Sequence, residues 1–291
     1  MPTYEDQIRA DIVEVGRRLW ARGFVASNDG NISVRLDEGR VVTTPTGVSK
    51  GFMTPDMMVV TDLSGRKLAG ERNASSELKM HLEVYRLRSD ARAVVHAHPP
   101  TATGFAVAGI ALDRAVLAEV ITTLGSIPIA EYATPSTDEL PAVCRKYLKA
   151  HDGLLLANHG AVALAGDVFT AYYRMETIEH FARISLTARL LGREHLISRE
   201  EVERLQQLRG SYGIQSPAPV CTDDTVRVGA EGELECQVVQ APFSGGPRLV
   251  PDTPLPRPAR EPAGVGTDGE IRLTYSELTA LIEDAVRSLK T

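Results

Sequence analysis

The order of apolar and polar positions predicts helices and short strands that alternate over roughly the first 215 residues. Apolar side chains recur at helical spacing over residues 4–22, 78–87 and 168–191. Residues 136–152 are also expected to be helical, and residues 101–123 to form a helix and then a strand. Short apolar or alternating runs bounded by Gly, Pro, Asn or Ser predict strands at 31–35, 40–44, 57–62, 93–98, 127–132 and 154–159.

Two of these predicted strands end in histidine. The run 93–98 contains His96 and His98, which the two-residue period of a strand places on one face, and the run 154–159 ends at His159. As a pair, His96 and His98 are metal ligands or ordinary hydrogen-bonded histidines. A zinc-like site needs about three or four ligands, so His159 and the nearby carboxylate Glu77 favour the metal site.

Three turns are built from small polar residues, namely Gly30-Asn31, Pro45-Thr46-Gly47 and Ser75-Ser76-Glu77. Such turns expose backbone N–H groups and hydroxyls, which can bind an anion. For the first two, without further context, hairpin formation is the preferred explanation. In the third, Ser75 or Ser76 is expected to be the N-cap of the helix 78–87, and the N-terminus of that helix would also attract a phosphate.

Composition narrows the class of protein. The 291 residues are 43% hydrophobic and 24% charged, which is ordinary for a globular protein, and the formal net charge of −6 argues against a nucleic-acid partner. Three widely spaced cysteines indicate a reducing compartment rather than a zinc ribbon. We find no signal peptide and no apolar run of about 18 residues, so we expect a cytoplasmic protein without a membrane segment.

Taken in order and spacing, these motifs resemble the class II aldolase/adducin family, and within it the fuculose-1-phosphate aldolases. They are Gly30-Asn31, Pro45-Thr46-Gly47, Ser75-Ser76-Glu77, His96-Ala97-His98 and Asn158-His159-Gly160. The resemblance covers roughly residues 5–215 and implies an α/β fold, a three-layer α/β/α sandwich around a largely antiparallel sheet. It also implies a catalytic domain over 1–216 and a homotetramer with active sites at subunit interfaces.

The same resemblance assigns roles to individual residues. It implies one Zn²⁺ per chain, held by His96, His98 and His159 with Glu77, and it makes Glu77 the catalytic acid/base. The implied activity is cleavage of a ketose 1-phosphate, a small sugar phosphate, to dihydroxyacetone phosphate and an aldehyde such as lactaldehyde. Tyr212 matches a tyrosine that closes over the site. The residues that match the family's phosphate-binding positions are Gly30, Asn31, Thr46, Gly47, Ser75 and Ser76.

One departure affects the aldehyde end of the site. Leu117 stands where the fuculose-phosphate aldolases have a tyrosine that donates a proton, so the donor and the aldehyde are left open, with Tyr132 and Tyr212 as substitutes. A decarboxylase of phosphorylated sugar acids also stays open. The related 4-epimerases have an aspartate where this chain has Glu77, and adducin-like interaction modules need no zinc histidines.

The residues after 216 lie beyond what the family requires. A run rich in Pro and Gly predicts a linker over 217–270, with a short hairpin at 226–239. In 271–291, a capping box at Thr274–Glu277 precedes apolar residues at helical spacing, which predicts a short amphipathic helix. We expect this helix either to pack on its own catalytic domain or to bind a shell protein. The second alternative follows from its resemblance to the peptides that target enzymes into bacterial microcompartments.

Overall fold

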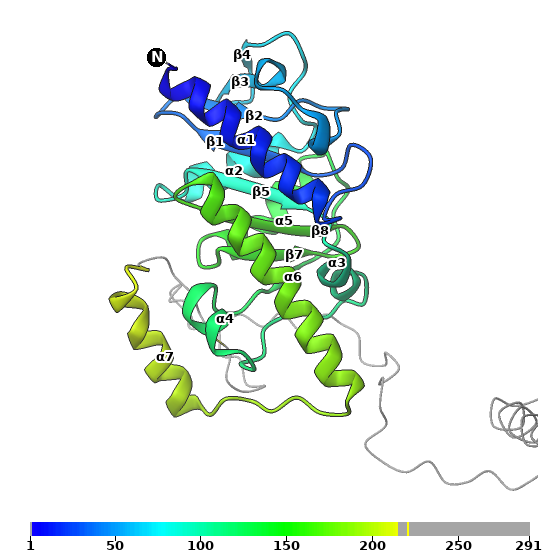
Figure 1. Cartoon of the computed structure of the whole chain (residues 1–291), viewed down its shortest axis with the longest axis vertical. Coiled ribbons are helices and arrows are strands. Elements are labelled where there is room, and N and C mark those ends of the chain that lie inside the picture. The colour runs from blue at the N-terminus through cyan, green and yellow to red at the C-terminus, as the bar shows by residue number, and fades with distance from the viewer. Residues whose placement is uncertain (1, 215–219, 221–291) are drawn as a thin grey trace, which may run out of the picture. The chain divides into compact units, whose positions relative to one another are not determined.

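A single sheet organises the part of the chain that the structure describes. The computed structural model describes residues 2–214 and residue 220. Its sheet has eight strands in the order β4-β3-β2-β1-β5-β8-β7-β6 (Figure 1). Neighbouring strands are antiparallel except for β6 and β7, which are parallel. The strands are β1 Asn31–Arg35, β2 Arg40–Thr43, β3 Val59–Asp62, β4 Lys67–Ala69, β5 Ala93–Ala97, β6 Ile129–Ala130, β7 Gly153–Leu156 and β8 Gly160–Ala165.

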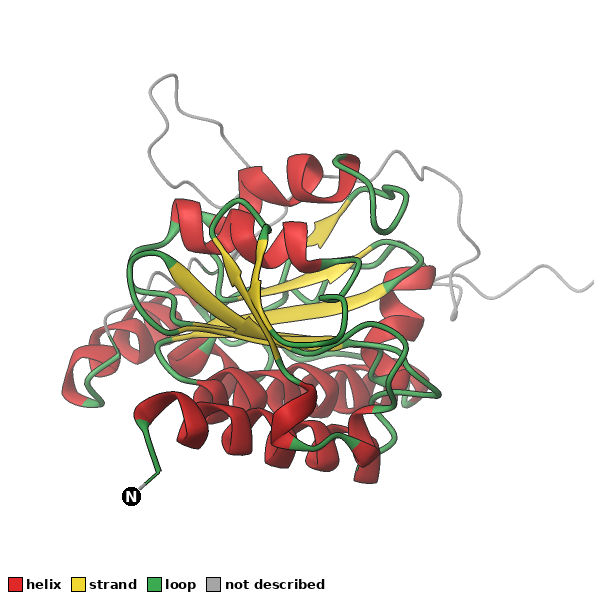
Figure 2. Ribbon diagram, turned by 90° about the horizontal axis from the view of Figure 1, so that it is seen from above, coloured by secondary structure: helices red, strands yellow, loops and turns green. Residues whose placement is uncertain are grey.

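Helices cover both faces of this sheet, which lies as the middle layer in Figure 2. On one face α1 and α6 lie side by side (Figure 1) and bury Leu19 and Phe181 against strand residues such as Val95. On the other face α2 and α5 bury Tyr85 and Leu148. The helices are α1 Tyr4–Ala21, α2 Leu78–Leu87, α3 Pro100–Val107, α4 Ala118–Thr123, α5 Glu139–Leu148, α6 Val168–Leu190 and α7 Arg199–Ser211, with single 3-10 turns at Lys50–Phe52 and Pro55–Met57.

The predicted α/β/α sandwich with a largely antiparallel sheet is thus confirmed. The predicted helices 4–22, 78–87 and 168–191 correspond to α1, α2 and α6, because each has one apolar face and a core to bury it in. The expected strand at 127–132 is shorter, since β6 contains only Ile129–Ala130 and follows Pro128, which has no N–H to donate.

One further expectation differs from the structure, and others lie outside the residues it describes. The stretch 101–123 was expected to contain a helix and then a strand, but it forms α3 and α4, and Leu112 makes only an isolated bridge to Ile127. The predicted linker, the hairpin at 226–239 and the helix at 271–291 lie outside the described residues. None of the helices that are described is both long enough and apolar enough to span a bilayer.

Candidate metal centre and anion cavity

The centre of the site is the end of strand β5. His96 is fully buried there, because β5 lies between β1 and β8 in the middle of the sheet. Its Nδ1 lies 2.9 Å from the carbonyl oxygen of Ala161 on β8. A carbonyl only accepts hydrogen bonds, so Nδ1 carries the proton and Nε2 keeps a free lone pair. That tautomer is the one that binds a metal ion through Nε2.

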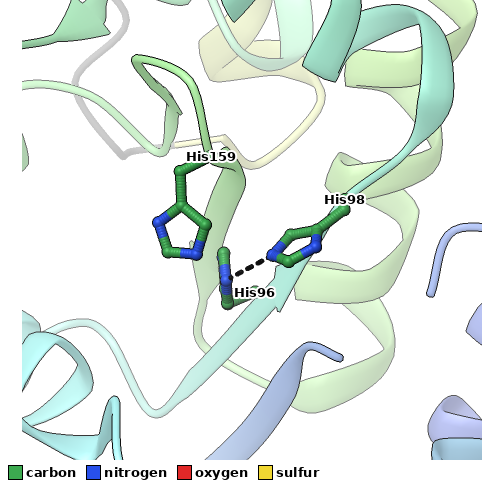
Figure 3. A group of neighbouring side chains, drawn as sticks. All are labelled: His96, His98 and His159. Atoms are coloured by element: carbon green, nitrogen blue, oxygen red, sulfur yellow. Dashed lines mark hydrogen bonds between the residues drawn. The ribbon is translucent and has the colours of Figure 1, made fainter. Parts of the chain in front are cut away.

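His98, just beyond the end of the same strand, and His159, from another segment, approach His96 (Figure 3). His98 follows β5 directly, and its backbone N–H donates to Phe24 at 2.9 Å. His159 lies in the turn between β7 and β8, where Asn158 has a φ of 56°. Gly160 allows this close approach, since a Cβ there would lie 2.5 Å from Cδ2 of His98. A larger residue at 160 would push the two imidazoles apart.

The three imidazoles converge as metal ligands do. One ring nitrogen from each of His96, His98 and His159 lies within 4.8 Å of the others, and among the described residues this is the only such group of His, Cys, Asp and Glu. The Nε2 atoms of His96 and His98 are 3.2 Å apart. Two nitrogens each ~2.0–2.1 Å from a tetrahedral ion lie about 3.3 Å from one another. The spacing therefore fits a shared ion.

The register of β1 against β5 brings a carboxylate to this cluster. Asn31 pairs with His96, and its Nδ2 donates to Oε2 of Glu77 at 2.9 Å. The Glu77 oxygens lie 3.3 Å from Nε2 of His96 and 3.2 Å from Nε2 of His159. Gly30 permits this pairing, because at its φ of 71° a Cβ would lie 2.7 Å from the His96 carbonyl. The predicted set of His96, His98, His159 and Glu77 is therefore assembled in space.

The charges in the cluster suit a cation. Burial, with the charges of His96 and His159, lowers the pKa of His98 to about 4, so this imidazole is neutral near pH 7. Burial acts to raise the pKa of Glu77, but His96 and His159 outweigh it and hold the pKa below its ordinary value. At His96, burial acts to lower the pKa, but the Glu77 carboxylate outweighs it and raises the pKa above its ordinary value. A bound cation would compete with a proton for Nε2 of His96.

A cavity of about 220 Å³ opens beside the cluster. It is lined by His98, His159 and Glu77 and by every small residue that the sequence singled out for phosphate binding. Those residues are Gly30, Asn31, Thr46, Gly47, Ser75 and Ser76. The three small-residue turns thus form one concave surface, and hydroxyl, amide and backbone N–H groups are the donors an anion requires.

Backbone pairing holds two of these turns together. Pro45 bridges Ala74, and Thr46 N–H donates to Asn73 at 3.0 Å. The expected N-cap of α2 was wrong, because Glu77 occupies that position and makes no side-chain capping bond. The helix starts later because the Ser75 carbonyl accepts from the N–H of Leu78. Ser75 and Ser76 consequently line the cavity instead of capping the helix.

Three residues considered in the sequence analysis do not line this cavity within one chain. Tyr212 is the C-cap of α7 and is exposed, and Tyr132 is exposed as well. Neither residue lines the cavity. Leu117 lines a different cavity of about 690 Å³, together with Phe24 and Glu179. The two cavities have no lining residue in common.

The sequence reasoning missed two charged residues that line the cavity, Asp29 and Lys50. Asp29 lies 3.4 Å from Nδ1 of His98, on the opposite side of the ring from the nitrogen that faces His96. Its position next to Gly30-Asn31 was a signal that could have found it. Lys50 follows Gly47 closely, but only the tertiary structure reveals that its side chain is 2% exposed.

Comparison with known proteins decides the family. Residues 10–186 match the model of the class II aldolase and adducin N-terminal domain. The chain belongs to the class II aldolase/adducin family. A 5-deoxy-D-ribulose 1-phosphate aldolase from Bacillus thuringiensis is 32% identical over 209 residues, which are 71% of this chain and 97% of that protein. The family resemblance read from the motifs is thereby confirmed.

Two other relatives indicate how far activities vary. A solved structure of L-fuculose 1-phosphate aldolase is 31% identical, with a TM-score of 0.65 over 69% of this chain and 95% of that one. A 3-oxo-tetronate 4-phosphate decarboxylase from Pectobacterium atrosepticum is 29% identical over 184 residues, which are 62% of this chain and 84% of that protein. The protein is therefore an enzyme of the lyase type, and its substrate has to be argued from the site.

Proposed function

We propose that the protein is a zinc-dependent aldolase that cleaves a ketose 1-phosphate to dihydroxyacetone phosphate and a small aldehyde. The observation that supports this most strongly is the contact between two features. The cluster of His96, His98, His159 and Glu77 borders the cavity lined by small polar residues. An anion held in that cavity would place its neighbouring carbon atoms beside the cluster.

Zn²⁺ fits the donor set, which consists of three imidazoles with converging nitrogens and one ionised carboxylate. When bound, Zn²⁺ supplies a Lewis acid for the carbonyl and hydroxyl oxygens of the substrate. Glu77 would carry protons to and from the carbon that becomes negative when the C3–C4 bond breaks. The hydrogen bond from Asn31 at 2.9 Å holds the Glu77 carboxylate in one orientation for that transfer.

The phosphate would be bound by the small polar residues of the cavity. Thr46, Ser75 and Ser76 bring hydroxyl donors, and Gly30 and Gly47 bring backbone N–H groups. These groups orient the substrate and take no part in bond breaking. The amide of Asn31 is partly committed to Glu77, so we assign it to the carboxylate as well as to the phosphate.

The aldehyde end of the site requires a proton donor, and the lining residues of the cavity in one chain include no tyrosine that could take this role. We propose a homotetramer with sites between subunits, in which exposed Tyr212 closes over a site. Tyr132 is the other exposed candidate. Exposed leucines at the end of α6 and just after it support an association surface: Leu186, Leu190 and Leu191.

A substrate panel on the purified, zinc-loaded enzyme tests this function. We expect dihydroxyacetone phosphate release from at least one of fuculose, rhamnulose or deoxypentulose 1-phosphate, followed by a coupled NADH assay. A chelator should abolish the release and added Zn²⁺ should restore it. Full turnover of a metal-free preparation would contradict the metal's role.

The decarboxylase relative makes decarboxylation of a phosphorylated sugar acid the second candidate. The same zinc centre and phosphate cavity serve both reactions. Release of CO₂ from 3-oxo-tetronate 4-phosphate, with no dihydroxyacetone phosphate from any ketose phosphate, would replace the aldolase proposal. A 4-epimerase would produce neither product, and an adducin-like interaction module would turn over no substrate.

For the region after residue 216 we propose a linker over 217–270 and an amphipathic address segment over 271–291, on sequence pattern alone. Deleting 271–291 is expected to leave turnover unchanged, and fusing 271–291 to an unrelated protein should carry it into a microcompartment. Charged residues at Leu281 and Ile282 should abolish this targeting, whereas Arg287→Gln on the polar face should preserve it. A sharp loss of activity on deletion would instead indicate packing on the catalytic domain.

A further inference from the structure

Lys50 occupies an unusual position beside the anion cavity. It begins the 3-10 turn Lys50–Phe52, three residues after Gly47, and its side chain is 2% exposed while lining the cavity. Its Nζ donates to the carbonyl oxygens of Asn28 at 2.9 Å and Val48 at 2.7 Å. The ammonium thus ties the loop that precedes Gly30 to the loop that follows Gly47.

The charge of this ammonium has no adjacent counter-ion. Lysines are almost never fully buried unless they are paired. Within the described part of the chain, no carboxylate oxygen lies within 4.0 Å of Nζ of Lys50, the limit for an ion pair. Burial lowers the pKa of Lys50 to about 8, and the charges of Asp29 and Glu77 oppose this only in part. Lys50 is therefore a desolvated cation at neutral pH.

The other donors of the cavity are neutral. The hydroxyls of Thr46, Ser75 and Ser76 and the backbone N–H groups can hydrogen-bond a phosphate, but they would also bind an uncharged hydroxyl group. A buried positive charge favours a dianion over a neutral group. The ammonium has no ion-pair partner in the free protein, and it gains one when the dianion binds. Charge therefore adds selectivity that the neutral donors do not provide.

We propose that the Lys50 ammonium is the counter-charge for the phosphate of the substrate and determines the selectivity of this enzyme for phosphorylated over unphosphorylated ketoses. The carbonyls of Asn28 and Val48 accept two of its three N–H donors, and the third would donate to the anion. The two carbonyl bonds also set the separation of the loops that carry the neutral donors. This inference rests on the proposed function only in requiring a phosphorylated substrate, whichever bond the enzyme breaks.

Binding of inorganic phosphate to the zinc-loaded protein, measured by calorimetry, tests the proposal without catalysis. Lys50→Met keeps most of the side-chain length and removes the charge, and we expect phosphate affinity to fall about ten- to a hundredfold. Zinc content should not change, because Lys50 is not one of the converging ligands. Arg35→Met is the matched control, since Arg35 is a buried cation on β1 that does not line the cavity.

The pH dependence of phosphate affinity gives a measurement on the unmodified protein. Because burial lowers the pKa of Lys50 to about 8, the ammonium is present below that pH and is lost as the pH rises through it. Phosphate affinity should accordingly fall above pH 8 and should not show this fall in Lys50→Met. Glu77 and His98, which face the same cavity, do not titrate in this range, because the pKa of Glu77 is held below its ordinary value and that of His98 is lowered to about 4.

Kinetics then separate selectivity from structural damage. With the cleaved ketose phosphate, Lys50→Met should raise KM and lower kcat/KM about ten- to a hundredfold, while kcat/KM for the unphosphorylated ketose stays within about twofold. Equal losses for both substrates, or phosphate affinity within twofold of the parent, would overturn the inference and leave the aldolase function standing. Reduced phosphate affinity in a protein that cleaves no ketose phosphate would support the inference and reject the function. If Lys50→Met does not fold, the pH step in the parent protein decides.

Discussion

His96→Ala is expected to release the bound divalent ion and to lower turnover by more than about a hundredfold. Loss of partners that only orient metal ligands already costs ~10–100-fold, and His96 is itself a proposed ligand. It is fully buried, and its Nε2 lies 3.2 Å from Nε2 of His98 and 3.3 Å from the Glu77 carboxylate. Metal content after gel filtration and turnover on the cleaved ketose phosphate provide the measurements.

His151→Ala is the matched control for this variant. His151 is also buried, but its Nδ1 bonds the Ser126 carbonyl at 3.1 Å and it belongs to no metal-binding group of the described residues. It should retain the ion and most of the activity while losing some stability. If His96→Ala kept a full complement of metal, the proposed centre would be wrong.

Glu77→Gln is expected to lower turnover by about two to four orders of magnitude, the usual contribution of a positioned acid/base. The amide keeps the shape of the side chain and its oxygen still accepts from Asn31, so the fold and the affinity for inorganic phosphate should change little. What the variant loses is the group that accepts and returns a proton. Single-turnover kinetics, phosphate calorimetry and metal content should be measured together.

Glu83→Gln tests whether the effect of Glu77→Gln belongs to the site. Glu83 is a buried carboxylate on the same helix, α2, where it pairs with Arg145 at 2.6 Å and does not line the cavity. Its loss should lower stability and leave turnover near that of the parent. A Glu77→Gln enzyme with turnover within threefold of the parent would move the acid/base role to another residue.

Local pattern was enough to predict much of the metal cluster. A strand places every second residue on one face, so the period of two put His96 beside His98 before any fold was known. Helices α1, α2 and α6 were predicted for a similar reason, since each carries an apolar stripe at helical spacing. The order and spacing of the small-residue and histidine motifs then indicated the family, which the match over residues 10–186 confirmed.

Contacts between segments distant in sequence decided the rest of the site. The Asn31–His96 register carries Glu77 to the imidazoles, and β-strand registers depend on which strands pair, which local pattern does not encode. The separation of Leu117 from the cavity was decided in the same way.

Lys50 illustrates the difference most clearly. In the sequence it is an ordinary lysine after a Gly-containing turn, a residue type that is normally exposed. Its burial and its bonds to Asn28 and Val48 arise only when two loops 20 residues apart fold over it. The sequence by itself determined which residue types are available for metal and phosphate binding, because those follow from short-range spacing. Tertiary structure decided which of them share one cavity and which charge is left without a partner, because burial and pairing depend on contacts between distant segments.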